Sequence, residues 1–347
     1  MRPPAPLDGS TVTIRHIAVQ ASVSPSTVSR VLNKTAPVTA SKRAAVLSAV
    51  EALGYRPNVL AQELARGYSR AFGVLPQGIS NPFYGRLLKG IEQGLRGSGY
   101  YPIFASGEQP SEESQALDLL LSHRVDALIV VGGHLPDEDL AHLAERLPLV
   151  AVARTIRGLE HRCVQVDNRG GGYKATRHLL DLGHRRIAHV MGLPWHVDSI
   201  ARREGYEAAL AETGIAPDPR LVVEGDFEEQ SGFVAAEKLL ASGAGFTAIF
   251  AGNDQMACGA GLALFRRGYR VPRQVSIVGF DDQPCAAYTW PALTTVRQPT
   301  VEMGMAAARA LLDQLRGRGF VLPTFSTDLV LRDTTASPPA AEALEGV

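Results

Sequence analysis

The sequence of 347 residues has little cysteine, and its three cysteines lie far apart with no C-x-x-C spacing. A disulfide framework uses an even set of cysteines, and zinc sites commonly use closely spaced pairs. The cysteine content therefore argues against both and favours a reducing compartment. The three residues are Cys163, Cys258 and Cys285. We expect no metal and no cofactor.

Long hydrophobic runs are also absent, since no segment offers the ~18 uninterrupted apolar residues that a membrane-spanning helix needs. The first ten residues contain prolines and an aspartate but no apolar stretch typical of a secretion signal. We therefore expect a cytoplasmic protein without membrane contact. The 45% of hydrophobic residues is typical of a globular protein, and the length predicts two or three domains.

The whole chain has no excess of charge, because 35 basic residues balance 35 acidic ones. Residues 11–67 differ, because only Glu51 and Glu63 oppose the basic side chains there. The basic residues are Arg15, Arg30, Lys34, Lys42, Arg43, Arg56 and Arg66. Such a segment is typical of a module that binds nucleic-acid phosphates, with an ordinary solvated surface as the alternative.

The same segment has the pattern of two short helices joined by a tight turn. Thr13 caps a helix over 14–20, and Ser24 followed by Pro25 starts the second helix. In that helix one side faces the core with Val28, Val31 and Leu32, and the other faces outward with Pro25, Ser26, Ser29 and Arg30. The pattern predicts a helix-turn-helix for the DNA major groove, with a plain helical hairpin as the alternative.

A third helix is predicted to start at Thr39 or Ser41 and to stop at Gly54. Its predicted core face consists of Val46, Leu47, Val50 and Leu53. Asn58 then caps a helix of two turns, which is too short to be stable alone in water. We expect this second segment to become ordered only on contact with a partner.

Residues 12–33 and 54–64 resemble the headpiece and the hinge helix of the lactose and galactose repressor family. The resemblance implies binding to double-stranded operator DNA, with Leu64 from each of two subunits in the minor groove. The implied DNA contacts are Thr13, Pro25, Ser26, Thr27, Ser29, Arg30, Asn33, Asn58, Ala61 and Leu64. One departure is Ser22, where the family most often has glycine, and we expect this substitution to be tolerated.

From Phe72 onward, short apolar runs alternate with helical stretches, which predicts parallel sheets built from β-α-β units. Two doubly wound subdomains fit this many strands better than one sheet. The predicted strands include 101–104, 127–131, 149–152, 186–190, 247–250 and 275–278.

This region resembles the periplasmic-binding-protein-like effector domain of the same repressors, through motifs such as 79–83, 252–254 and 278–282. The resemblance implies effector contacts from Phe83, Arg202, Phe227, Asn253 and Asp281. It also implies three chain crossings between the two subdomains. Gln77-Gly78 and Ala153 depart from residues that relatives often carry, which puts the contact near the first strand in doubt.

The expected organisation has five parts. They are a disordered extension (1–10), a helix-turn-helix headpiece (11–57), a hinge helix and linker (58–70), an effector-binding and dimerisation domain (71–333) and a disordered tail (334–347). We place the first subdomain at about 71–165 and 300–327, and the second at about 166–299 and 328–333.

Other functions find less support in the sequence. The triplet 170–172 lacks the spacing of a phosphate-binding loop, so a helix start is the better interpretation. His178, His184 and His189 span a helix, a turn and a strand, which favours structural roles over a metal site. No catalytic nucleophile or acid and base pair stands out, and a solute receptor for transport would leave the basic headpiece unexplained.

The sequence therefore predicts a non-enzymatic, homodimeric transcription regulator. We expect it to repress a carbohydrate-utilisation operon and to respond allosterically to a small-molecule effector. Similarity to the galactose and β-glucoside branch of the family favours a sugar, with a nucleobase corepressor as the alternative. The tail has no leucine heptad, so a tetramer is not predicted.

Overall fold

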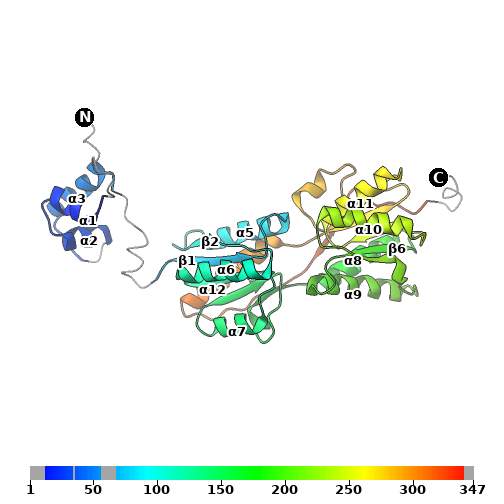
Figure 1. Cartoon of the computed structure of the whole chain (residues 1–347), viewed down its shortest axis with the longest axis horizontal. Coiled ribbons are helices and arrows are strands. Elements are labelled where there is room, and N and C mark those ends of the chain that lie inside the picture. The colour runs from blue at the N-terminus through cyan, green and yellow to red at the C-terminus, as the bar shows by residue number, and fades with distance from the viewer. Residues whose placement is uncertain (1–11, 34–35, 56–67, 340–347) are drawn as a thin grey trace. The chain divides into compact units, whose positions relative to one another are not determined.

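The computed structural model describes residues 12–33, 36–55 and 68–339, and it divides into two compact units, Met1–Tyr68 and Ser69–Val347 (Figure 1). Three of the predicted DNA contacts, Asn58, Ala61 and Leu64, lie outside the described residues. The predicted N-terminal extension and residues 340–347 also lie outside them.

The first unit contains a headpiece of three helices, α1 (Ile14–Gln20), α2 (Pro25–Asn33) and α3 (Ala40–Ala52). Their buried core consists of Ile17, Ala18, Val28, Val31, Val46 and Ala49. The prediction for Leu47 is wrong, because this side chain is 52% exposed. Consecutive residues of a helix lie about 100° apart around its axis, so Leu47 cannot share the inward direction of Val46.

The turn between α1 and α2 holds Ser22 in the left-handed backbone region, with φ of 51°. Glycine occupies this region without the steric cost that a Cβ introduces. The turn is closed by hydrogen bonds from Ser22 N to Val19 O (3.1 Å) and from Val23 N to Ala18 O (3.0 Å). The conformation accounts physically for the preference for glycine that the resemblance implied here.

The second unit consists of two lobes, each built around a six-stranded sheet with helices on both faces (Figure 1). The sheet of lobe 1 has the order β11-β5-β4-β3-β1-β2, and all its strands are parallel. The strands are β1 (Ala71–Pro76), β2 (Tyr101–Phe104), β3 (Ala127–Val131), β4 (Leu149–Val152), β5 (Cys163–Val166) and β11 (Thr324–Phe325). One face packs on α5 (Pro82–Leu95) and α12 (Thr300–Leu315), and the other on α6 (Pro110–Ser122) and α7 (Asp137–Ala144).

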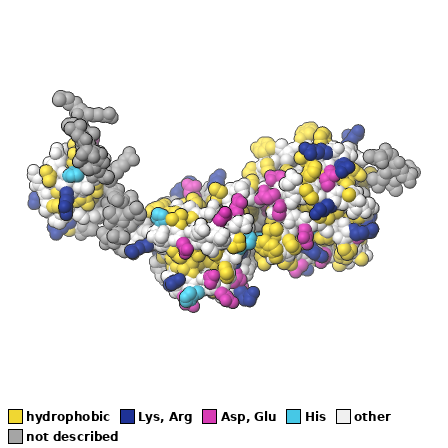
Figure 2. Space-filling model, viewed as in Figure 1, with side chains coloured by type: hydrophobic (Ala, Val, Ile, Leu, Met, Phe, Trp, Pro, Cys, Tyr) yellow, Lys and Arg dark blue, Asp and Glu magenta, His cyan; other side chains and the backbone are white. Residues whose placement is uncertain are grey.

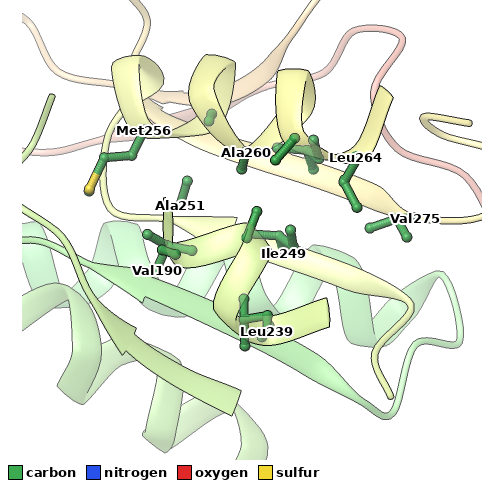
Figure 3. Close-up of a cluster of buried hydrophobic side chains, with 14 of the residues drawn as sticks. Val190, Leu239, Ile249, Ala251, Met256, Ala260, Leu264 and Val275 are labelled. Carbon is green, nitrogen blue, oxygen red and sulfur yellow. The ribbon is translucent and has the colours of Figure 1, made fainter. Parts of the chain in front are cut away.

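The sheet of lobe 2 has the order β12-β10-β9-β8-β6-β7, and only the β10–β12 pair in it is antiparallel. The strands are β6 (Ile187–Met191), β7 (Val222–Glu224), β8 (Ala248–Ala251), β9 (Ser276–Asp281), β10 (Thr294–Arg297) and β12 (Asp328–Val330). One face packs on α8 (Asn168–Asp181) and α9 (Val197–Glu212), and the other on α10 (Glu229–Ala241) and α11 (Asp254–Arg266). Figure 3 shows the core between this sheet and the helices α10 and α11, where Val190 and Ile249 of the sheet meet Leu239 and Leu264 of the helices.

Short 3₁₀ helices complete the second unit; they are η1 (Glu160–Arg162), η2 (Pro219–Leu221) and η3 (Pro284–Ala287). The chain passes between the lobes three times, after β5, after β10 and after β11. As a result, α12 and β11 belong to lobe 1 although they follow the main part of lobe 2 in sequence.

Three helix pairs of the second unit approach closely at glycines. The glycines are Gly90 and Gly304 in α5 and α12, Gly172 and Gly205 in α8 and α9, and Gly232 and Gly259 in α10 and α11. A Cβ atom added at Gly90 would lie 2.1 Å from Val301 O of α12, a distance that real side chains do not tolerate. The glycine triplet 170–172 accordingly belongs to the start of α8 and to its contact with α9.

The predicted fold class is confirmed: an α-helical headpiece precedes two doubly wound, mainly parallel sheets. The predicted start of a disordered tail at residue 334 is wrong, because the following residues bind to lobe 2. Thr334 Oγ1 donates to Ile277 O (2.7 Å), and Ala336 N donates to Ser276 Oγ (3.0 Å). Among the described residues, no helix has the length and apolar character needed to cross a membrane.

Candidate functional site

A small cavity of about 60 Å³ lies between the two lobes, where residues that follow the carboxyl ends of several strands come together. Lobe 1 contributes Asn81, Phe83, Tyr84 and Ala153, and lobe 2 contributes His196, Asp198, Arg202, Phe227, Asn253 and Asp281. All five predicted effector contacts therefore line one cavity, while their role in binding a ligand stays a prediction.

Arg202 of α9 is buried, and lobe 2 holds its guanidinium in place. Nε donates to Asn168 Oδ1 (2.9 Å), and Nη1 donates to Gly252 O (2.5 Å). The guanidinium carbon lies 3.8 Å from the centre of the Phe280 ring, and Nη2 lies 3.8 Å from Asp281 Oδ1. Since a guanidinium has five N–H donors, Nη2 keeps donors for a ligand at a fixed position.

Asp281 ends β9 with φ of 110°, which turns its carboxylate toward the cavity. Gln298 Nε2 donates to Oδ1 (2.6 Å), and Gln283 Nε2 lies 3.5 Å from Oδ2. Burial raises the pKa of Asp281 to about 6, while Arg202 and Gln298 act to lower it. Above pH 6 this buried side chain is therefore mainly an ionised acceptor.

Asn253 and Phe227 form one wall of the cavity. Asn253 caps α11, since its Oδ1 accepts from Met256 N (2.9 Å), and its Nδ2 donates to Phe227 O (2.7 Å). This second bond holds Phe227 with φ of 72° in the loop after β7. The Phe227 ring lies 5.9 Å from the guanidinium of Arg202 and offers an apolar surface beside it.

The opposite wall comes from the start of α5. Asn81 caps the helix by accepting a hydrogen bond from Phe83 N (3.0 Å), and the Phe83 and Tyr84 rings meet edge to face at 5.5 Å. Tyr84 donates through its hydroxyl to Gln77 Oε1 (3.1 Å). Burial first, and then nearby carboxylates such as Asp198, raise the pKa of Tyr84.

Three lining residues, Tyr84, His196 and Asp198, lie outside every motif and departure that the sequence analysis singled out. His196 caps α9 through Nδ1, which accepts from Asp198 N (3.3 Å), and burial lowers its pKa. A usable signal existed, because residues 192–198 follow a predicted strand just as the Asn253 and Asp281 segments do.

Asp254 and Asp282 are the sequence neighbours of Asn253 and Asp281, but their carboxylates bind other groups of the protein. Asp254 accepts from Gln283 N (2.7 Å), and Asp282 forms ion pairs with Arg297 and Arg332.

The headpiece presents part of its predicted DNA-contact set to solvent. Thr13, Pro25, Ser26 and Arg30 are exposed, and Figure 2 shows basic side chains on the surface of this unit. Thr27, Ser29 and Asn33 are half-buried and bonded within the unit: Thr27 Oγ1 lies 2.9 Å from Ser24 Oγ, and Asn33 Nδ2 donates to Ser29 Oγ (3.1 Å). The exposed face of α2 thus carries hydroxyls and one guanidinium above an apolar core.

The histidines considered for a metal bind separate protein partners. His189 is stacked between Tyr206 and Phe250, and burial lowers its pKa to about 4. His178 Nε2 lies 3.0 Å from Thr335 Oγ1, and His184 Nδ1 lies 2.8 Å from Thr247 Oγ1. In the part of the chain that the structure describes, no group of three or more His, Cys, Asp or Glu side chains is arranged to hold a metal.

Comparison with known proteins matches both units. The sequence pattern described as "Bacterial regulatory proteins, lacI family" matches residues 13–58, and that of a periplasmic binding protein-like domain matches residues 176–335. The HTH-type transcriptional regulator GalR of Escherichia coli (strain K12) is 39% identical over 330 residues, which cover 94% of this chain and 96% of that protein.

Solved structures show similarity over almost the same length. The Lac repressor dimer bound to operator and the anti-inducer ONPF has a TM-score of 0.84 at 29% identity, covering 94% of this chain and 100% of that one. The complex of the transcriptional regulator CelR with cellobiose has a TM-score of 0.71 at 32% identity, covering 93% and 99%.

Proposed function

Because this chain belongs to the lacI family of bacterial regulatory proteins and is a DNA-binding transcriptional regulator, not an enzyme, we propose that a sugar in the cavity between its lobes controls its affinity for an operator. The observation that carries the proposal is the cavity wall. It combines a fixed guanidinium, an amide, a carboxylate and aromatic rings around one cavity. The regulated genes would be those of a carbohydrate-utilisation operon.

The chemistry of the wall suits a hydroxylated ring. Asp281 accepts hydrogen bonds and Arg202 Nη2 donates them, so neighbouring hydroxyls have a partner for each role. Phe83 and Phe227 supply flat apolar surface for the C–H face of the ring. The similar regulator CelR is known in complex with a sugar, cellobiose, which supports this assignment.

In the headpiece, we assign base and phosphate contacts to the solvent-facing side of α2. Arg30 has the forked donors that suit guanine, and Ser26 and Ser29 have the small hydroxyls that suit phosphates or base edges. Asn58, Ala61 and Leu64 complete the proposed contact set in the segment that joins the two units. We also propose a cytoplasmic location, because binding to an operator requires access to chromosomal DNA.

A homodimer is proposed because exposed hydrophobic side chains gather on lobe 2. Phe265 is 76% and Trp290 98% exposed, and both line an open cavity of about 700 Å³ between α11 and the loop after η3. Figure 2 shows hydrophobic side chains at the surface of the lobe that carries α10 and α11. Monomers rarely leave large contiguous apolar surface in water, and the similar Lac repressor is a dimer.

The proposed control works through closure of the lobes. Arg86 Nη1 of lobe 1 donates to Asp282 O of lobe 2 (3.1 Å), and the rings of His134 and Trp195 meet across the lobes at 5.3 Å. A ligand held by both walls favours the closed arrangement by its difference in affinity for the closed and open states. In a dimer this shifts the two copies of lobe 1, and with them the paired segments that lead to the headpieces.

The proposal is tested by binding of the full-length dimer to DNA fragments from upstream of its own gene and its neighbours, at two salt concentrations. The panel of effectors is galactose, glucose, methyl β-glucoside, cellobiose and hypoxanthine. Site-specific binding that weakens with salt and is changed by one sugar supports the proposal. A response to hypoxanthine alone would replace the sugar by a nucleobase corepressor, and sugar binding without specific DNA binding would point to a solute receptor.

A further inference from the structure

The cavity has more negative than positive side chains. Its lining contains two carboxylates, Asp198 and Asp281, against one guanidinium, Arg202. His196, which also lines it, is held toward its neutral form because burial lowers its pKa. The charge of Arg202 is already faced by Asp281 at 3.8 Å, so it offers little free attraction to an anion.

Asp198 is the member of this set whose role is unassigned. It lies in the first turn of α9, one turn before Arg202, and its carboxylate has no hydrogen-bond or ion-pair partner among the described residues. By contrast, Gln298 and Gln283 donate to Asp281. Negatively charged side chains are stabilising in the first turn of a helix, and the carboxylate of Asp198 has such a position at the cavity.

Neighbouring groups reinforce the negative field. Beside burial, four carboxylates raise the pKa of the Tyr84 hydroxyl, which places Asp198, Asp281, Glu113 and Glu228 all within electrostatic reach of the cavity wall. Two arginines outside the lining have partners of their own: Arg154 donates to Asp137 Oδ1 at 2.7 Å, and Arg86 donates to Asp282 O at 3.1 Å.

We propose that Asp198 makes the cavity selective against anions, so that the effector is a polyhydroxylated ligand without a negative charge, and phosphorylated or acidic sugars are rejected. This inference rests on the proposed sugar-binding function and narrows its ligand class. A carboxylate of the ligand would lie beside two like charges, Asp198 and Asp281. At an effective dielectric constant of about 20, one such contact at roughly 5 Å weakens binding on the order of 100-fold.

The test compares neutral sugars with acids of nearly the same shape by titration calorimetry of the full-length protein at pH 7.5. The pairs are galactose with galacturonic acid, glucose with glucuronic acid, and cellobiose with cellobiuronic acid. Each pair is measured on the unsubstituted protein, on Asp198→Asn, and on Glu204→Gln as a control. Glu204 is an exposed acid on the same helix and does not line the cavity.

We expect the neutral member of a bound pair to bind at least tenfold more tightly than the acid. Asp198→Asn should lower the ratio of the two affinities severalfold by strengthening the binding of the acid, and Glu204→Gln should leave that ratio unchanged. Retained binding of the neutral sugar shows that Asp198→Asn has folded. Equal affinity for both members, or an unchanged ratio in Asp198→Asn, would overturn the inference and leave the sugar effector standing. If no sugar of either kind binds while operator binding persists, the sugar proposal itself fails.

Discussion

At the scale of single residues, Asp281, which we propose as an effector contact, lowers the stability of the folded chain. Its pKa is about 6 in the folded chain against an ordinary value of 3.8, so the folded protein binds this proton more tightly than the unfolded chain does. Ionisation of Asp281 therefore lowers the free energy of unfolding as the pH rises from about 4 to about 6. The cause is burial, which the partial attraction of Arg202 does not offset.

Asp281→Asn should accordingly raise the melting temperature at pH 7.5, on the order of a few °C, while abolishing the response to the effector. The gain should disappear at pH 4, where the carboxyl group of the unsubstituted protein is already neutral. Calorimetric melting at both pH values measures the difference. A lower melting temperature at pH 7.5 would mean that the attraction between Arg202 and Asp281 outweighs burial.

Ser22 gives a second prediction at this scale, because its backbone lies in the left-handed region at φ 51°. Ser22→Gly should stabilise the headpiece by about 0.5–1 kcal/mol, since glycine removes the contact between Cβ and the backbone. Ser22→Asn should give a smaller gain, because asparagine tolerates this region better than serine. Denaturant unfolding followed by circular dichroism measures both, and a destabilised glycine variant would contradict the account.

Much of the site could be predicted residue by residue. The five predicted effector contacts line one cavity because they lie near the carboxyl ends of strands, Phe83 in lobe 1 and the other four in lobe 2, where the two sheets face each other. Tyr84 was missed because its place in the cavity depends on how the lobes meet. His196 and Asp198 follow β6 as Asn253 follows β8, so the signal for them was present but was not used. Gln77 and Ala153 are the two positions in the second unit where the sequence departs from residues that relatives often carry. Ala153 lines the cavity, whereas Gln77 lies outside the lining and accepts a hydrogen bond from the Tyr84 hydroxyl.

At the scale of elements, α5 offers a direct comparison between two glycines. A Cβ at Gly90 would lie 2.1 Å from Val301 O, whereas one at Gly85 meets nothing within 4 Å. Gly90→Ala should therefore cost about 1–3 kcal/mol of stability through overpacking against α12. Gly85→Ala, the matched control, should gain up to about 1 kcal/mol from helix propensity.

Denaturant unfolding of the second unit measures both α5 variants. Loss of stability in both would show that Gly85 has a role beyond propensity, and no loss in Gly90→Ala would show that α5 and α12 separate at little cost. Because α5 begins at the cavity wall, Gly90→Ala should also weaken the response to the effector.

Long elements were predictable from the sequence and short ones were not. The six quoted strands match β2, β3, β4, β6, β8 and β9 to within a few residues. Five of them are apolar runs buried on both faces, and β2 is a half-exposed edge strand. β7, β11 and β12 have only two or three residues, so their partners in the sheet define them and their composition does not. Leu47 failed for a different reason: it follows Val46 directly, and the step of about 100° around the helix axis turns it away from the core that Val46, Val50 and Leu53 contact.

At the scale of the whole molecule, effector response and DNA binding should separate by mutation. Arg202→Ala should weaken the effector at least tenfold and remove its influence on the operator, because the cavity loses its fixed donor. Basal operator binding should stay within a factor of about two. Arg203→Ala is the control, since Arg203 is exposed on the same helix and pairs with Glu207 at 2.7 Å.

Gel-shift titrations with and without the effector measure both arginine variants. Loss of basal operator binding in a folded Arg202→Ala protein would mean that Arg202 acts on the DNA-binding state itself, and its assignment to effector binding would be wrong. If Arg203→Ala also lost the response to the effector, the exposed face of α9 would take part in the coupling between effector binding and operator binding.

Dimerisation gives the last prediction. Phe265→Ser should weaken self-association at least tenfold, because this side chain contributes to the exposed apolar surface of lobe 2. Val321→Ser is the control, since Val321 is 93% exposed but lies on lobe 1 before β11. Sedimentation at several concentrations measures the dimer, and an unchanged dimer in Phe265→Ser would place the interface elsewhere.

The late return of α12 to lobe 1 also sets an order of events on the ribosome. The headpiece is complete by residue 55 and most of lobe 2 is one continuous stretch, but one face of the lobe 1 sheet lacks α12 until residue 315 has been made. At ordinary rates of translation, roughly 7–30 s separate the end of β5 from the end of α12. During that time the nascent chain carries a complete headpiece joined to an incomplete lobe 1. The part of the chain that binds DNA is therefore made before the part that is proposed to respond to the effector is complete.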